Sequence, residues 1–384
     1  MKIDEPWLRA APLAAILAAF QTAGYRAYLV GGAVRNAVLG EAIGDLDLAT
    51  DATPDQMVQL AKAAGIKAIP TGIDHGTMTL IASGIPFEIT TFRRDVETDG
   101  RRAIVAYTQD MQEDARRRDF TMNALYASAD GMVIDPLGGL ADALARRVRF
   151  IEDADQRIRE DYLRILRFFR FHAQYGSDGG IDADGLAAVA DNLDGLHGLA
   201  RERIGSEMLR MLGAPDPAPA IAAMAQVGAL ARVLPGADHR ALAPLIHVEG
   251  DAQAPPDAIR RLAALGGDNA RDALRLSNAD AVRLKMLSSA LGDMAGAGAL
   301  GYRHGARAAR DVLLLRAALL EQPLDPDTLA AADAGASSIF PVTAADLMPD
   351  YLGAALGARL KLLEERWIAS GFALTKGDLL KEGI

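Results

Sequence analysis

The sequence predicts an α+β protein in which a small mixed β-sheet at the N-terminus is followed by an all-helical remainder. Between residues 26 and about 137, short apolar runs alternate with breaks rich in Gly, Pro and Asp, as in strands joined by turns. From about residue 140 onward this pattern disappears, and Ala, Leu and Arg recur at helical spacing. A sheet domain followed by helical domains is the simplest architecture that accounts for the change.

The individual elements follow from local patterns. Residues 1–24 have the composition of an amphipathic helix that ends at Gly24. Thr53 and Pro54 combine an N-cap with proline at the first helical position, so a helix is expected to begin there. Residues 93–114 are polar and charged, which favours a mobile loop. The expected strands are 27–30, 45–49, 66–69, 76–82 and 86–92, with a turn at 83–86 between the last two.

Breaks rich in Gly, Pro and Asp also divide the helical part of the chain. They lie at 176–185, 213–219, 249–257 and 335–349. We therefore expect a sheet domain at 1–138 and helical domains at 139–212, 213–334 and 335–384.

Composition limits the class of protein. With 384 residues and 50% hydrophobic content, the chain can bury several cores. Its net charge of −10 excludes a generally basic nucleic-acid binder, so any contact with nucleic acid must come from local arginine clusters. The absence of cysteine excludes disulfides, thiolate metal sites and cysteine nucleophiles. No signal peptide or apolar run of membrane length is recognisable, so we expect a soluble cytoplasmic protein without membrane contact.

A glycine turn follows the first expected strand. Gly31 and Gly32 interrupt the apolar run 27–30, and residues 33–39 have helical composition up to Gly40, a suitable C-cap. A glycine turn that opens a helix presents free backbone N–H groups, which bind phosphate. Arg35 would add a positive charge for the same anion. The alternative is an ordinary strand–turn–helix corner, because glycine is the usual residue of tight turns.

Two carboxylates lie just downstream of the glycine turn. Asp45 and Asp47 are two residues apart in an expected strand, so both would lie on one face. Such a pair needs a counter-charge, and Mg²⁺ binds carboxylate and triphosphate oxygens together. Glu88, in the last expected strand, would add a third carboxylate for a two-metal site. The alternative is that these carboxylates simply face water at strand ends and edges.

An arginine cluster at 116–118 is followed directly by Asp119 and an apolar segment. This indicates that the arginines are held in a fixed position rather than on a solvent-exposed face. Arg118 would bind triphosphate and Asp119 a ribose hydroxyl, while Asn123 would supply amide hydrogen bonds. The alternative is a capped helix start with no ligand.

Asp161 and Arg164 are three residues apart in a segment with helical spacing that continues to Arg167, so one face would carry an acceptor beside a forked donor. Cytosine and adenine both present an amino donor next to a ring-nitrogen acceptor, whereas uracil and guanine present a carbonyl beside an N–H. The pair would therefore accept C and A and reject U and G. The alternative is a surface salt bridge, worth only a few tenths of a kcal/mol.

Taken in order and at their spacings, these motifs resemble the bacterial class II tRNA nucleotidyltransferase and poly(A) polymerase family of the DNA polymerase beta superfamily. The motifs are Gly31-Gly-Ala-Val-Arg35, Asp45-Leu-Asp47, Arg117-Arg-Asp-Phe-Thr-Met-Asn-Ala124 and Glu160-Asp-Tyr-Leu-Arg164. Segments 135–142 and 201–207 strengthen the resemblance, which covers residues 28 to about 210. It implies that the expected domains are a nucleotidyltransferase head followed by a helical neck, body and tail.

The resemblance also implies an enzyme that adds CCA to the 3′ end of tRNA without a template, using CTP and ATP, Mg²⁺ and a two-metal mechanism. The implied partner is the tRNA acceptor stem with its 3′ end, and no protein partner is implied. Together with the residue patterns, it predicts the catalytic residues Asp45, Asp47 and Glu88, of which the two aspartates bind metal. The predicted nucleotide-binding residues are Gly31, Gly32, Arg35, Arg118, Asp119, Asn123, Asp161, Arg164 and Arg167.

Several alternatives stay open. A poly(A) polymerase would be helped by a basic tail, but residues 375–384 are nearly neutral. An enzyme that adds only A or only C to tRNA is a further alternative. A small-molecule nucleotidyltransferase would not need the 117–124 motif or the long helical part, and an inactive RNA-binding scaffold would not need the three carboxylates.

One position departs from the family pattern. The family usually has aspartate directly after the arginine of the glycine motif, and this chain has Asn36. The substitution removes a charge beside Arg35, so the sequence leaves the orientation of Arg35 undetermined.

Overall fold

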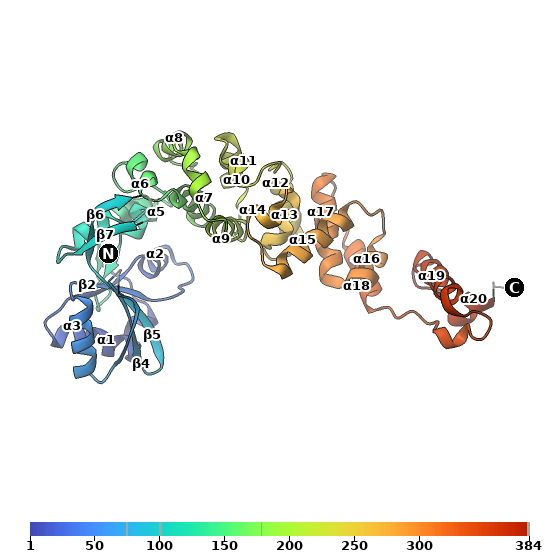
Figure 1. Cartoon of the computed structure of the whole chain (residues 1–384), viewed down its shortest axis with the longest axis horizontal. Coiled ribbons are helices and arrows are strands. Elements are labelled where there is room, and N and C mark those ends of the chain that lie inside the picture. Colours follow the sequence, from blue (N-terminus) through green and yellow to red (C-terminus); the bar gives the residue numbers. More distant parts are fainter. Residues whose placement is uncertain (74–75, 100–101, 178, 382–384) are drawn as a thin grey trace. The chain divides into compact units, whose positions relative to one another are not determined.

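The computed structural model describes residues 1–73, 76–99, 102–177 and 179–381 (Figure 1). The chain forms two compact units, residues 1–233 and 234–384. All strands of the described residues lie in the first unit, and the second is helical. The predicted α+β class is therefore confirmed, while the finer division into four domains stays a prediction.

The first unit contains a mixed sheet in the order β3-β4-β5-β2-β1-β8-β9. Strands β2 and β5 pair in parallel, and the other neighbouring strands are antiparallel. The strands are β1 (Ala27–Val30), β2 (Asp47–Thr50), β3 (Lys67–Gly72), β4 (Thr77–Ala82), β5 (Ile85–Thr91), β8 (Tyr126–Ala127) and β9 (Val133–Ile134).

Three helices of the first unit pack on strands of this sheet and bury apolar residues there. Helices α1 (Ala11–Thr22) and α3 (Pro54–Ala63) contact β4, and α2 (Gly32–Leu39) contacts β1. Helix α3 begins as predicted, because Thr53 and Gln56 form a reciprocal capping box and Pro54 occupies the first turn. Helix α2 ends as predicted at Gly40, whose φ of 69° is left-handed.

Three local predictions need correction. Strand β2 begins at Asp47, so Asp45 lies before the strand rather than in it. Residues 1–24 form a 3₁₀ helix (Pro6–Arg9) and α1 instead of one helix. The expected loop at 93–114 contains the hairpin strands β6 (Arg93–Asp99) and β7 (Arg102–Tyr107) and the helix α4 (Met111–Arg116). Polar composition concealed this hairpin because its strands pair only with each other.

The rest of the first unit is helical, and aromatic side chains join its helices to the sheet. The ring centroid of Phe120 lies 4.9 Å from that of Phe171 and 5.0 Å from that of Phe150. Phe171 belongs to α7, so this cluster fixes α7 against the segment that carries Asp119. The helices are α5 (Gly139–Leu144), α6 (Ala154–Glu160), α7 (Leu163–Tyr175), α8 (Ala183–Asp191), α9 (Arg201–Leu212), α10 (Ala218–Gln226) and α11 (Ala229–Val233).

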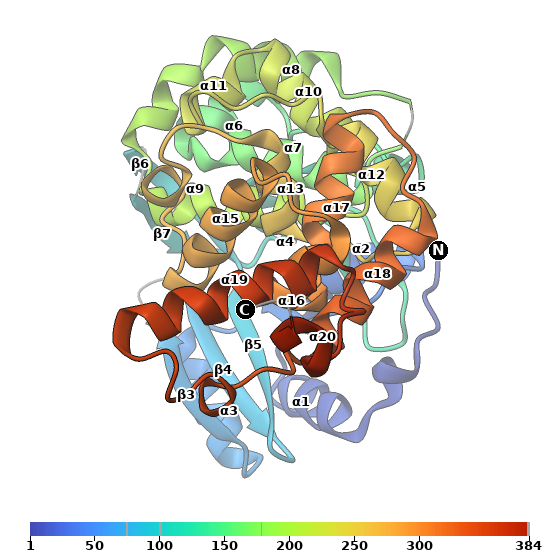
Figure 2. The same ribbon diagram turned by 90° about the vertical axis from the view of Figure 1, so that its right-hand side faces the viewer.

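In the second unit, α16 and α18 lie side by side (Figure 1 and Figure 2). Glycine permits this close contact, because a Cβ at Gly335 would lie 2.0 Å from the carbonyl oxygen of Gly298. No helix of the described residues is long and apolar enough to cross a membrane. The helices are α12 (Leu242–Asp251), α13 (Ala258–Leu265), α14 (Ala270–Ala273), α15 (Asn278–Leu291), α16 (Ala297–His304), α17 (Ala306–Leu319), α18 (Pro326–Ser337), α19 (Gly353–Ala369) and α20 (Lys376–Lys381).

A buried ion network ties α12, α13, α15 and α17 together. Arg260 donates to Glu249 at 2.7 Å and to Asp311 at 2.9 Å, and all three residues are buried. Asp311 also accepts from Arg283 at 2.7 Å. Each buried charge in this network has its counter-charge. Removal of one residue would therefore leave another buried charge without its partner.

We predict that Asp311→Ala lowers the free energy of unfolding by about 3 to 5 kcal/mol, because the substitution leaves Arg260 buried with one carboxylate fewer. Urea denaturation followed by circular dichroism measures the change. The matched control is Asp333→Ala, which removes the partner of the exposed Arg310 and should cost at most about 1 kcal/mol. Equal losses of unfolding free energy in the two variants would contradict the role of Asp311 in a buried ion network.

Candidate active site

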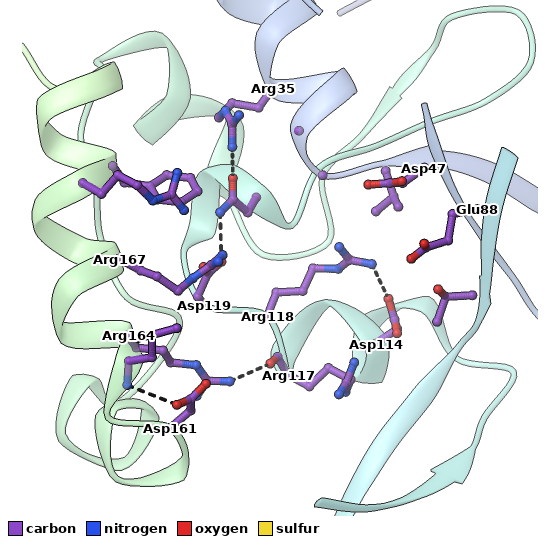
Figure 3. A pocket seen from close by; sticks show the side chains of 18 of the residues that line it. Arg35, Asp47, Glu88, Asp114, Arg117, Arg118, Asp119, Asp161, Arg164 and Arg167 are labelled. Carbon is purple, nitrogen blue, oxygen red and sulfur yellow. Dashed lines mark hydrogen bonds and ion pairs between the residues drawn. The ribbon is translucent and has the colours of Figure 1, made fainter. Parts of the chain in front are cut away.

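A cavity of about 700 Å³ lies in the first unit between the sheet, α4, α7 and α9 (Figure 3). Arginines outnumber carboxylates in its lining, although the whole chain is acidic. Such a local excess of positive charge suits a polyanion such as a triphosphate. Of the predicted site residues, Asp45 is the one missing from the lining. The others are Gly31, Gly32, Arg35, Asp47, Glu88, Arg118, Asp119, Asn123, Asp161, Arg164 and Arg167.

The glycine turn has a conformation that requires glycine. Gly31 has φ 67° and ψ −122°, a region that other residues avoid. Its N–H donates to the carbonyl of Leu125 at 3.1 Å, so this donor is already used within the protein. The N–H groups of Gly32 and the next two residues lie in the first turn of α2, where no helical carbonyl accepts them. The backbone donors available to an anion therefore begin at Gly32.

Asp47 and Glu88 face each other across neighbouring strands. They are register partners in the parallel pair of β2 and β5, so both side chains lie on the same face of the sheet. Figure 3 shows both carboxylates on the same side of the cavity. Loss of hydration, followed by repulsion from Glu88 and Asp45, raises the pKa of Asp47 to about 6, although Arg118 opposes the shift. Asp45 thus contributes charge from just outside the cavity.

This pair of carboxylates fits a divalent cation. Burial is the main cause of the raised pKa of Asp47, and the neighbouring charges of Glu88 and Asp45 add to it, so a cation bound here would relieve their repulsion. Among the described residues, no three His, Cys, Asp or Glu side chains form a metal-binding group by themselves. A bound cation would therefore take its remaining ligands from water and from triphosphate oxygens, as hard cations at phosphate sites do.

Arg118 occupies the centre of the cavity (Figure 3). It donates to Asp114 at 2.9 Å, and Asp114 also accepts from the hydroxyl of Tyr126 at 2.7 Å. Asp114 is buried, so it fixes the direction of Arg118 toward the glycine turn. Sequence reasoning missed Asp114, although its spacing of four residues from Arg118 was a usable signal.

Asp119 connects the sheet domain with α7. One carboxylate oxygen accepts from Nε of Arg167 at 2.8 Å, and the other accepts from the amide of Asn123 at 2.9 Å. Burial opposes ionisation, but Arg167 and these hydrogen bonds hold the pKa of Asp119 below its ordinary value. Asp119 therefore stays ionised and holds α7 beside the cavity.

Asp161 and Arg164 do not share a helix, which corrects the sequence prediction. Asp161 is the extended C-cap of α6, and α7 begins at Leu163. Asp161 accepts from Arg203 at 2.8 Å, while Arg164 donates to Glu160 at 2.5 Å. The two side chains thus have separate partners, and the surface salt bridge between them considered above is not formed. In the sequence, Arg203 lies in the motif segment 201–207, but no role was predicted for it.

Family models match two parts of the chain. Residues 27–149 match the poly A polymerase head domain, and residues 180–240 match the probable RNA and SrmB-binding site of polymerase A. These two matches support the resemblance of residues 28 to about 210 to the class II tRNA nucleotidyltransferase and poly(A) polymerase family. The second match covers α8, α9, α10 and α11, which follow the head in the first unit.

Individual members of the family are similar to this chain over part or all of its length. It is 46% identical to the mouse mitochondrial CCA tRNA nucleotidyltransferase 1 over 186 residues, which are 48% of this chain and 43% of that protein. It is 40% identical to the CCA-adding enzyme of Geobacillus thermodenitrificans over 215 residues, which are 56% of this chain and 52% of that protein. The chain thus spans about half the length of the curated relatives it matches.

A solved structure extends the similarity to nearly the whole fold. The CCA-adding enzyme of Bacillus stearothermophilus in complex with CTP superposes with a TM-score of 0.75 and 29% identity, over 96% of this chain and 94% of that chain. The Thermotoga maritima CCA-adding enzyme complexed with tRNA has a TM-score of 0.72 over 99% and 95% of the two chains, and its 17% identity shows the fold alone.

The departure of this chain from the family pattern at Asn36 is explained by its contacts. The side-chain oxygen of Asn36 accepts from Nε and Nη2 of Arg35 at 3.0 and 2.8 Å. Its amide nitrogen donates to the carbonyl of Ala42 at 2.6 Å. Asn36 therefore orients Arg35 and also ties α2 to the segment that leads into Asp45 and Asp47.

Arg35 itself is buried and held by neutral groups. Besides Asn36, it donates to Asn123 at 2.5 Å and to the hydroxyl of Tyr175 at 2.7 Å, and its guanidinium lies 4.0 Å from the Tyr175 ring centroid. In the described part of the chain, none of its hydrogen-bond acceptors is a carboxylate. Burial lowers the pKa of Arg35, although Tyr175 and Asp119 oppose the shift. The positive charge of Arg35 is thus available to an anionic ligand, and its neutral hydrogen-bond partners fix the position of the guanidinium.

We predict that Asn36→Ala lowers the free energy of unfolding by about 1 to 3 kcal/mol, because the buried Arg35 loses an acceptor. Thermal melting and urea denaturation measure the loss. The matched control is Asn278→Ala, which removes an exposed asparagine acceptor from Arg271 and should cost less than about 1 kcal/mol. Similar losses in both variants would show that Asn36 does not support a buried charge.

We predict that Asp47→Asn raises the melting temperature at pH 8 in the absence of divalent metal. With its pKa raised to about 6, Asp47 binds a proton in the folded state that the unfolded chain has already released. Its contribution to stability therefore falls as the pH rises from the ordinary aspartate pKa to about 6, and asparagine removes this penalty. Melting at pH 4 and pH 8 in EDTA should show the difference at pH 8 only. Excess Mg²⁺ should stabilise the wild type more than the variant.

Proposed function

We propose that this protein adds CCA to the 3′ end of tRNA, using CTP and ATP and releasing pyrophosphate. The observation that carries the proposal is the cavity that brings together the glycine turn, the Asp47 and Glu88 carboxylates, and Asp161 and Arg164, which are not paired with each other. The named functions of the similar mouse and Geobacillus proteins support it. So does the fold shared with the CTP complex of the Bacillus enzyme.

The first step is binding of the triphosphate. The free N–H groups at the start of α2 and the guanidinium of Arg118 would donate to phosphate oxygens. Asp114 keeps Arg118 extended toward this position. Because Arg35 has no carboxylate partner among the residues that the structure describes, its charge would add to the attraction from behind the turn. Asp119, ionised beside Asn123, would accept from a ribose hydroxyl.

Asp47 and Glu88, with Asp45 close by, would hold Mg²⁺. When bound, Mg²⁺ supplies the Lewis-acid chemistry that activates the 3′-hydroxyl of the tRNA and stabilises the departing pyrophosphate. Because the pKa of Asp47 is raised only to about 6, its carboxylate is ionised at neutral pH, and a divalent cation would relieve its repulsion from Glu88 and Asp45.

Base selection would depend on Asp161 and Arg164. A carboxylate oxygen of Asp161 accepts from the amino group of C or A, and the Nε–H of Arg164 donates to the adjacent ring nitrogen. Uracil and guanine would place a carbonyl against Asp161 and an N–H against Arg164, which leaves polar groups unpaired. Selection of C and A over U and G therefore requires no nucleic-acid template.

The partner is the acceptor stem of tRNA with its 3′ end. Side chains cannot read the deep, narrow major groove of an A-form duplex, so recognition is mostly by shape and by contacts with 2′-hydroxyls and phosphates. Arginines supply the contacts, since the chain as a whole carries a net charge of −10. The matched RNA-binding region at 180–240 is a suitable part of this surface.

The decisive experiment incubates the purified protein with tRNA that lacks its 3′ CCA and with each labelled nucleotide. We predict ordered addition of two C and one A with Mg²⁺, and no stable addition of U or G. Long A tracts would instead indicate a poly(A) polymerase, and addition stopping after C or requiring a CC end would indicate a C-only or A-only enzyme. Asp47→Ala should abolish transfer and keep tRNA binding, whereas the control Asp55→Ala, an exposed residue of α3, should keep activity.

A further inference from the structure

Asp161 lies at the break between α6 and α7, where two groups restrain its carboxylate. Nη2 of Arg203, in the first turn of α9, is 2.8 Å from Oδ2, and both side chains line the cavity. The other oxygen, Oδ1, accepts from the backbone N–H of Leu163 at 3.1 Å. A carboxylate oxygen can accept two hydrogen bonds, so each oxygen has a fixed direction and capacity for a ligand donor.

Arg164 is restrained by a different set of partners. Its Nη1 donates to Glu160 at 2.5 Å and to the carbonyl of Arg157 at 2.6 Å, and its Nη2 donates to the carbonyl of Arg117 at 3.2 Å. Within the described part of the chain, its Nε–H has no hydrogen-bond partner. The Asp161 carboxylate and the Arg164 guanidinium are thus held by different partners. Each keeps hydrogen-bonding capacity that a base could use.

We propose that Arg203 is a positioning residue for nucleotide selection, because it supplies the counter-charge that keeps Asp161 from pairing with Arg164. The inference rests on the proposed function, since it assigns Arg203 to the selection step of that reaction. An ion pair between Asp161 and Arg164 would occupy the very acceptor and donor that cytosine and adenine need. Arg203, which comes from a different helix, satisfies Asp161 without occupying Arg164.

The surroundings of Asp161 show where it would turn if Arg203 were removed. Burial lowers the pKa of Arg167, but the charges of Asp119, Glu207 and Asp161 raise it above its ordinary value. Asp161 therefore lies within electrostatic range of Arg167, while Arg164 is its neighbour along the chain. Without Arg203, the carboxylate would swing toward these arginines and lose the direction that suits a base.

Removal of Arg203 should change orientation rather than stability. The side chains of Arg203 and Asp161 are 40% and 33% exposed, and ion pairs at such positions contribute little to folding. Arg203→Ala is therefore expected to fold, which thermal melting verifies.

The test measures kcat/KM of Arg203→Ala for CTP and UTP on tRNA lacking CCA, and for ATP and GTP on tRNA ending in CC. We expect the CTP to UTP and ATP to GTP ratios to fall about tenfold or more, through a higher KM for CTP and ATP. Arg203→Lys keeps the charge and one donor, so it should restore most of the selectivity. Arg201→Ala is the matched control, because Arg201 lies in the same turn of α9, is exposed and does not line the cavity.

A double-mutant cycle shows whether Arg203 acts through Asp161. Asp161→Ala combined with Arg203→Ala should have the same selectivity as Asp161→Ala alone. Additive losses, wild-type ratios in Arg203→Ala, or an equal loss of activity with all four nucleotides would each overturn the inference. A wild-type enzyme that does not prefer CTP to UTP would overturn the proposed function, and the inference with it, so the two failures are distinguishable.

Discussion

The site depends on one chain of hydrogen bonds that joins helix α2 to helix α7. Arg35 donates to Asn123, Asn123 donates to Asp119, and Asp119 accepts from Arg167. The first three of these residues are buried, so a broken contact would leave a charge or an amide without a partner. The glycine turn and the helix that carries Arg164 therefore keep a fixed separation, as the proposed binding of a nucleotide at both ends requires.

Charge is distributed unevenly over the cavity, and this distribution determines its chemistry. Asp47 and Glu88 lie on the sheet, while arginines come from α7, α9 and the segment that follows α4. Each arginine described above has a carboxylate, carbonyl or aromatic partner that fixes its direction before a ligand binds. Such preorganisation lowers the cost of ordering side chains around a triphosphate. An acidic protein thereby offers a strongly cationic binding site.

Local patterns were sufficient to predict much of the fold. The first strand, the glycine turn with its helix and the capped start of α3 all depend on residues adjacent in sequence, and the structure confirms them. The β6–β7 hairpin and the two-residue strands β8 and β9 were missed, because short or polar strands acquire their conformation only by pairing. The helix expected across Asp161 was wrong because the Asp161 carboxylate accepts from the backbone N–H of Leu163, and this local bond lies where one helix ends and the next begins.

By itself the sequence determined the chemical groups of the site and their order along the chain, because motifs and their spacings are local properties. Only the tertiary structure decided which groups meet. Glu88 lies beside Asp47 through a strand register, and Tyr175 reaches Arg35 across 140 positions of the chain. Arg203 likewise reaches Asp161 from another helix. Contacts between distant segments depend on how helices and strands pack, and no local propensity encodes that packing.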